Sequence, residues 1–455
     1  MNKRLQKFCF IFLLFSFILC FGPITIIAED LPQKELWLQK FKFVPVESGE
    51  AVPKNIIDVS EIHFSVKIDL PVRQLVRISV PFPYGFMKPT GKVYLNSQGT
   101  EILADCRVLT TYGGSEKYIR RAMLSYVDEF KGSEKQYTVV RKEYEELPQK
   151  SDRQPLQIGG NTFNFDGSRI IVEKDGTNRF IFSVISPQSN TSAQETKEEI
   201  IERGEHYLWV RWLQWDEQFP KIVELRASST GQFAIRVLLQ RWAKEDGYAP
   251  EFGIGIEGDG SLSKTIEGSN NQVENTWTYD LNTGKEISFL ADNRKICFPD
   301  AAAWRKGIIS GEKMDTGWKI VYLRSRDIDK VPHQPMAWRM ANVYVGHSEL
   351  PAWNELLEPP VIPDFPVSLC RAVYDFDKCP EPENEVLREV VRWHRNAMAI
   401  TRLYGDDFGN ISTMPQNAVF GMNRLNHNTE IFYEYLRTCD ESIRKTFMLW
   451  CQNYA

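Results

Sequence analysis

The stretch IHFSVKID, residues 62–69, alternates apolar and polar side chains along its whole length. A repeat of two residues is typical of a β-strand that buries one face and exposes the other. Short stretches of similar character follow at close intervals, and glycines such as Gly99 and Gly132 separate them. Strands at this spacing predict a small β-barrel or sandwich over residues 56–145.

A second run of strand patterns covers residues 161–345, with turn signals such as Asp175-Gly176 between the strands. We expect a central β-sandwich there. Its most aromatic stretch reads YLWVRWLQW, residues 207–215. Tryptophan rings stack on the CH faces of sugars, so Trp215 is a candidate substrate-binding residue. Core packing is the second explanation of the same aromatic strand.

The sequence pattern changes beyond residue 350. Prolines cluster there, and they predict a connector over residues 346–382 because proline interrupts regular structure. Apolar residues then recur at helical spacing over residues 383–455, in three stretches. Three amphipathic helices make a small bundle at best, so we expect the start of a larger helical domain. This pattern predicts that the chain is an N-terminal fragment of a longer protein.

Residues 1–28 have the pattern of an export signal. Three cations within the first seven residues precede the apolar stretch 8–21, and Ala28 ends the segment. An uncleaved membrane anchor is the alternative, because the apolar segment is long enough to span a bilayer. We expect a secreted or extracytoplasmic protein, in a periplasm or at a cell surface, with no membrane attachment after cleavage.

The charge balance of the chain bears on whether its partner is a nucleic acid. The formal net charge of the chain is −5. A nucleic-acid surface needs clustered lysine and arginine, so the composition argues against a nucleic-acid partner. Oligomeric state cannot be inferred from the sequence.

Polar residues gather on one predicted helix near the C-terminus. Asn423, Asn426, His427 and Glu430 follow the spacing i, i+3, i+4 and i+7, which places them on one helix face. Hydrogen-bonding groups beside an imidazole can line a sugar-binding cleft. A solvated helix face with capping asparagines is the alternative interpretation.

The loop before this helix is rich in oxygen ligands. It contains Asp406, Asp407 and Asn410, and hard oxygen donors of this kind suit Ca²⁺. The same residues also serve as turn formers and helix caps, which is the alternative. A calcium site is therefore one of two hypotheses for this loop.

Several short motifs are similar to those of one protein family. The turn VPFPYG at residues 80–85 and GGS at residues 113–115 resemble the N-terminal RIFT-barrel domain of exo-rhamnogalacturonan-lyase-like proteins. The stretch WDEQFPK, residues 215–221, is similar to the start of that family's central β-sandwich. The stretch NRLNH, residues 423–427, resembles the opening helices of its α/α toroid.

This resemblance implies a fold that is mainly β and then α: an N-terminal RIFT-type β-barrel, a central β-sandwich and the start of an (α/α) toroid. It also implies a polysaccharide lyase with an acidic polysaccharide as partner. Such a reaction removes the proton α to a uronate carboxylate and expels the 4-linked sugar, which requires charge neutralisation, a base and a proton donor.

The three catalytic roles can be given to residues by their chemistry. Arg424 or Asn423 would neutralise the carboxylate, while His427 and Tyr404 would act as base and proton donor. Two alternatives stay open: a non-catalytic surface protein that binds glycans or other partners through its β domains, and a glycoside hydrolase on a similar toroid.

Overall fold

The structure, a computed structural model, describes a defined part of the chain. The described residues are 33–40, 46–47, 56–68, 71–113, 117–141, 155–174, 176–186, 195–216, 219–242, 252–266, 269–272, 276–280, 287–291, 293–298, 308–323, 336–347 and 361–374. The chain divides into two compact units, Met1–Val44 and Pro45–Ala455. In the first unit the structure describes the helix α2 (Gln33–Lys40).

Strands dominate the second unit. The single helix described there is α4 (Val367–Tyr374), and every other regular element is a strand. The predicted fold, mainly β and then α with a RIFT-type barrel, a sandwich and a toroid, is therefore wrong for the described part of the chain, where three sheets and no α/α toroid are found. Residues 383–455 lie outside the described residues. A helix with an amphipathic spacing is stable only where another surface buries its apolar face, and the sequence does not identify that surface.

The first sheet, sheet A, curls so that its two edge strands, β25 and β3, approach each other, which makes it nearly barrel-like. Neighbouring strands are antiparallel, and β1 (Val46–Glu47) adds a short parallel pairing to β5. In spatial order the path strands are β25 (Val361–Asp364), β2 (Glu61–Ile68), β7 (Glu134–Val140), β4 (Lys92–Ser97), β5 (Thr100–Thr111), β6 (Ile119–Glu129) and β3 (Arg73–Pro81).

Alternating burial explains the core of sheet A. In β2 the side chains of Ile62, Phe64 and Val66 are buried, whereas His63 is exposed, as the period of two predicts. The edge strand β25 belongs to the segment predicted as a connector. It contains Pro363, which an edge strand accepts because one side of its backbone needs no ladder hydrogen bond.

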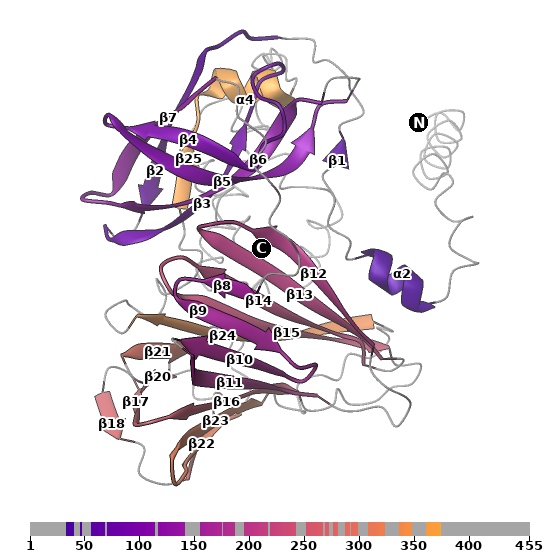
Figure 1. Ribbon diagram of the computed structural model, residues 1–455, viewed down its shortest axis with the longest axis vertical. Helices are drawn as coiled ribbons and strands as arrows, with labels where there is room; N and C mark the ends of the chain where they lie inside the picture. Colours follow the sequence, from indigo (N-terminus) through magenta and orange to yellow (C-terminus); the bar gives the residue numbers. More distant parts are fainter. Residues whose placement is uncertain are drawn as a thin grey trace, which may run out of the picture. The chain divides into compact units, whose positions relative to one another are not determined.

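The other two sheets follow in the chain (Figure 1). Sheet B consists, in spatial order, of β19 (Trp277–Asp280), β22 (Ile308–Lys313), β23 (Gly317–Leu323), β16 (Gly253–Asp259), β11 (Thr177–Ile185), β10 (Arg169–Lys174), β9 (Asn161–Phe165) and β8 (Leu156–Ile158). Sheet C consists, in spatial order, of β12 (Glu195–Arg203), β13 (Tyr207–Trp215), β14 (Lys221–Ser228), β15 (Phe233–Trp242), β24 (Met336–His347), β21 (Arg294–Cys297), β20 (Ile287–Ala291), β17 (Leu262–Ile266) and β18 (Ser269–Gln272).

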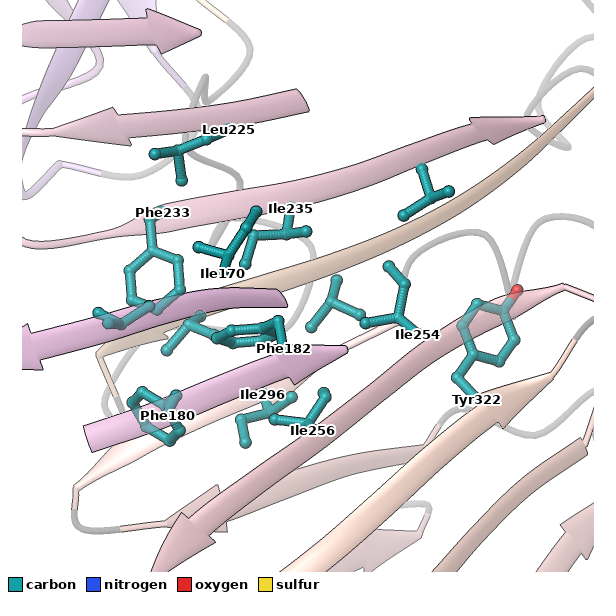
Figure 2. Close-up of a cluster of buried hydrophobic side chains, with 14 of the residues drawn as sticks. Ile170, Phe180, Phe182, Leu225, Phe233, Ile235, Ile254, Ile256, Ile296 and Tyr322 are labelled. Atoms are coloured by element: carbon teal, nitrogen blue, oxygen red, sulfur yellow. The ribbon is translucent and has the colours of Figure 1, made fainter. Parts of the chain in front are cut away.

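Sheets B and C bury one shared apolar core between them (Figure 2). Phe182 of sheet B meets Phe233 of sheet C edge to face, with 5.8 Å between ring centroids. Leu225 and Ile235 of sheet C and Ile254 of sheet B belong to the same cluster. The inner faces are apolar because burial of such side chains is the main stabilising term in folding. This leaves the other face of sheet C for a different use.

No helix among the described residues is long and apolar enough to cross a membrane.

Candidate functional site

The strand β13 turns two chemically different faces to its surroundings. Its even-numbered residues Leu208, Val210 and Trp212 belong to the shared core. Trp209 and Arg211 project from the opposite face, because successive side chains of a strand alternate. We call this opposite surface of sheet C the Trp209 face. It comprises Trp209, Arg211, Glu224, Arg226, Arg236 and Asn342.

The strand register of sheet C places opposite charges side by side on the Trp209 face. One row of directly paired residues runs across five neighbouring strands: Glu199, Arg211, Glu224, Arg236 and Asn342. In the adjacent row Trp209 is paired with Arg226. Paired residues lie close enough to interact directly, so the register itself builds an alternating row of charge.

Glu224 is the anionic centre of this row. Its side chain is 1% exposed, and it accepts from Arg211 Nε at 2.8 Å and from Arg226 Nε at 2.8 Å. Arg236 Nη1 lies 3.6 Å from the same carboxylate. Burial alone would raise the pKa of this carboxyl, but the three arginines outweigh burial and hold the pKa below its ordinary value. Glu224 therefore holds three cations in place.

Trp209 lies among three guanidinium groups. The centroid of its ring is 4.4 Å from the guanidinium carbon of Arg226, 4.9 Å from that of Arg211 and 5.1 Å from that of Arg107. These separations are within the range of cation–π attraction. Arg107 comes from β5, so sheet A also contributes to the surroundings of this ring.

A second buried carboxylate ties sheet A to β12. Glu202 accepts from Arg77 Nη2 at 2.6 Å, from Arg107 Nη1 at 3.3 Å and from Ser125 Oγ at 2.9 Å. The guanidinium of Arg77 lies 3.6 Å from the ring centroid of Tyr207. These contacts span strands of both sheets and so hold Arg107 beside the Trp209 face.

The turn between β12 and β13 anchors the same junction. Asp105 of β5 accepts the backbone N–H of Glu205 at 2.9 Å and that of His206 at 2.6 Å. His206 Nε2 lies 3.0 Å from the carbonyl oxygen of Leu103. Gly204 is required at the turn, because a Cβ there would collide with the carboxylate of Asp105. This junction is structural, and it fixes the orientation of β13.

The junction and the Trp209 face together carry a surplus of positive charge. Five arginines and four carboxylates, those of Asp105, Glu199, Glu202 and Glu224, give a formal charge of +1, within a chain whose formal charge is −5. The five arginines are Arg77, Arg107, Arg211, Arg226 and Arg236. Four of them, all except Arg77, keep between 15% and 21% of their side-chain surface accessible. Accessible guanidinium groups around an indole are suited to an anion attached to a ring.

The structure places one of the sequence-predicted site residues. Trp215 is the last residue of β13, partly exposed, and is paired with Glu195. It lies on the same face of β13 as Trp209, because the two residues are six positions apart, an even number, on an unbroken strand. The other predicted site residues lie outside the described residues: Tyr404, Asp406, Asp407, Asn410, Asn423, Arg424, Asn426, His427 and Glu430. The calcium and catalytic hypotheses stay predictions.

Sequence reasoning missed the arginines of the Trp209 face. The available signal was that arginines such as Arg226 and Arg236 occur within strands whose other residues are mostly apolar. That signal becomes meaningful only when the register brings these residues opposite Trp209 and Glu224, and the register cannot be read from one strand alone.

Comparison with known proteins gives likenesses of structure. No family model matches the sequence, and no curated protein matches it. Among solved structures, the chain is similar to an alpha-mannosidase from Enterococcus faecalis V583, with 8% sequence identity and a TM-score of 0.36. The match covers 71% of this chain and 46% of the mannosidase chain, so this chain spans less than half of that protein's length.

Proposed function

We propose that the chain is a carbohydrate-active protein that binds an acidic polysaccharide on the Trp209 face. The observation that carries the proposal is the ring of Arg107, Arg211 and Arg226 around Trp209, within a cluster of positive formal charge. A net negative protein that gathers cations on one surface favours an anionic ligand there.

The geometry suits a uronate sugar better than a simple anion. A guanidinium presents a planar fork of donors that matches the two oxygens of a carboxylate. An indole offers an apolar face to the CH groups of a sugar ring. Trp215 is partly exposed and supplies such a face, and Trp209 lies further along the same strand, packed against Arg226. The two rings lie six positions apart on β13, about 20 Å along the strand, so a glycan that contacts both would span several sugar units.

The finer parts of the proposal rest on the sequence. We propose β-elimination at uronate residues, with Arg424 or Asn423 at the carboxylate and with His427 and Tyr404 as base and proton donor. Residues 1–28 support secretion, which would bring the protein to polysaccharides outside the cytoplasm. A non-catalytic glycan-binding protein is the second candidate, because the Trp209 face on its own is suited to binding.

Retention on immobilised glycan tests the binding proposal. We expect the full chain to be retained on polygalacturonate and to pass through a neutral glucan matrix. The substitution Arg226→Met should abolish retention, because it removes the cation nearest Trp209 while keeping a similar stem. Arg141→Met, at an exposed ion pair with Asp58, is the matched control and should bind like the unchanged protein. Equal retention of both variants would contradict the proposal.

Product analysis separates the lyase from the binder. Incubation with pectic rhamnogalacturonan should raise the ultraviolet absorbance of unsaturated uronate if the chain eliminates, and His427→Ala should abolish that rise. Retention on the glycan without new absorbance would establish the non-catalytic candidate instead.

A further inference from the structure

A buried lysine lies at one end of the core between sheets B and C. Lys221 is the first residue of β14 and the last residue of the FPK motif, and it is 5% exposed. Lysine is rarely buried in proteins unless a partner or a function holds it there. Lys221 is not part of the Trp209 face, since its amine contacts Ser186, which follows β11.

The partner of Lys221 is a serine. Lys221 Nζ lies 2.8 Å from Ser186 Oγ, a normal hydrogen-bond distance. Ser186 directly follows β11 of sheet B, whereas Lys221 begins β14 of sheet C. The hydrogen bond therefore joins sheet B to sheet C, across the end of their shared apolar core. Ser186 is half-buried, whereas Lys221 is 5% exposed.

Further polar groups surround this pair. Gln214 is the direct cross-strand partner of Lys221 and is 1% exposed. Its Nε2 donates to Thr196 Oγ1 at 3.2 Å and to the carbonyl oxygen of Gly167, while its Oε1 has no hydrogen-bond partner among the described residues. A buried and unpartnered amide oxygen is uncommon, and it leaves an acceptor for a bound group.

A carboxylate lies nearby on the chain. Asp216 is 6% exposed, and its Oδ1 accepts the backbone N–H of Phe219 at 2.9 Å. Burial lowers the pKa of the Lys221 amine below its ordinary value, and Asp216 opposes that shift. Burial therefore increases the fraction of the amine that is neutral, and only a neutral amine can accept a proton.

We infer that Ser186 and Lys221 form a nucleophile–base pair that cleaves short acyl esters. A serine hydroxyl is a weak nucleophile until an adjacent base takes its proton, and a buried lysine amine can be that base. The pair has the required features: a hydrogen-bond contact, a desolvated amine and a serine residue that is more exposed than its lysine partner. This activity is independent of the glycan binding proposed above.

The reaction balances without a cofactor. Ser186 Oγ bonds to the acyl carbon while its proton moves to Lys221 Nζ, and the bond from that carbon to the alcohol oxygen breaks. The ammonium of Lys221 returns the proton to the departing alkoxide. Water then attacks the acyl-serine, Lys221 takes a proton from that water, and the proton passes to Ser186 Oγ as the acid leaves. The net reaction is ester plus water to acid plus alcohol.

Labelling of the full chain tests the pair directly. A fluorophosphonate probe should modify Ser186, as mapped by peptide mass, and p-nitrophenyl acetate should be hydrolysed with an acetyl group trapped on the same peptide. Ser186→Ala and Lys221→Met should each lower hydrolysis by at least about 10²-fold, the usual contribution of a positioned base. Ser183→Ala, a serine of the same strand, is the matched control and should leave labelling and hydrolysis unchanged.

A third variant distinguishes loss of the base from loss of folding. Lys221→Arg keeps a cation at this position but cannot accept a proton at neutral pH. It should retain the β-sheet circular dichroism of the unchanged protein and lose hydrolysis as Lys221→Met does. No fluorophosphonate label on Ser186 of the unchanged protein would overturn the inference, and so would full hydrolysis by Lys221→Arg.

Discussion

Each face of sheet C contains fully buried residues, but the two faces are built from opposite chemistry. Val210 on the inner face is 0% exposed, and Glu224 on the outer face is 1% exposed. The inner face gains stability from apolar area, which has no preferred direction. The stability of the outer face depends on ion pairs, so each buried charge requires oppositely charged neighbours. One strand can therefore pack one face into a core and present a charged, ligand-sized surface with the other.

Removal of a large inner side chain should give the largest effect. Phe233→Ala deletes a ring that contacts Phe163, Phe180 and Phe182, and its cavity should destabilise the fold by about 3–5 kcal/mol. Urea unfolding followed by circular dichroism measures the free-energy change. A loss below about 1 kcal/mol would show that this core is loosely packed.

Removal of the central anion of the outer face should have a smaller effect. Glu224→Gln keeps the shape of the side chain but leaves Arg211, Arg226 and Arg236 without their counter-charge. Because these arginines are partly accessible, solvent screens them, and we expect a loss of about 1–3 kcal/mol. The same urea experiment measures it. Stability equal to that of the unchanged protein would mean that the outer face does not depend on pairing.

The two faces should also differ in their response to acid. The pKa of Glu224 is depressed in the folded protein, so its contribution is present above its unfolded pKa, about 4.3, and is lost as pH falls through the folded pKa. Glu224→Gln should remove that part of the pH dependence, whereas Phe233→Ala should keep it. Urea midpoints at a series of pH values measure both. Parallel pH profiles for Glu224→Gln and the unchanged protein would contradict this prediction.

An exposed ion pair on sheet B should give the smallest effect. Lys319 Nζ lies 3.2 Å from Glu257 Oε1, and more than a third of each side chain is accessible. Surface pairs of this kind contribute about 0–1 kcal/mol, so Lys319→Met should change stability very little. Urea unfolding compared directly with Glu224→Gln measures the difference. A loss as large as that of Glu224→Gln would show that burial does not distinguish the two pairs.

The strands could be predicted because their signal is local. The alternation of Ile62, Phe64 and Val66 gives both the strand and the face it buries. The aromatic stretch 207–215 likewise predicts a strand. Core packing, one of the two explanations of that stretch, applies to Trp212, while Trp209 lies on the other face.

The Trp209 face could not be predicted because its signal is not local. Arg226 and Arg236 acquire their meaning from the cross-strand register, which depends on turns and on neighbouring strands. Arg107 reaches Trp209 from another sheet, more than a hundred residues away in the chain. The Ser186–Lys221 contact also joins two sheets, so neither residue stands out from its local sequence. The predicted α/α toroid is not found in the described part of the chain, and helical spacing alone does not specify a packing partner.

Thermal unfolding with and without an acidic oligosaccharide tests the central claim most directly. A ligand that binds only the folded state stabilises it by about 2.7 kcal/mol at a hundred times its Kd. We predict that an oligogalacturonate raises the Tm of the full chain, that Arg226→Met loses this rise, and that Arg141→Met keeps it. An equal rise in both variants, or no rise in the unchanged protein, would contradict the assignment of the Trp209 face as the binding site.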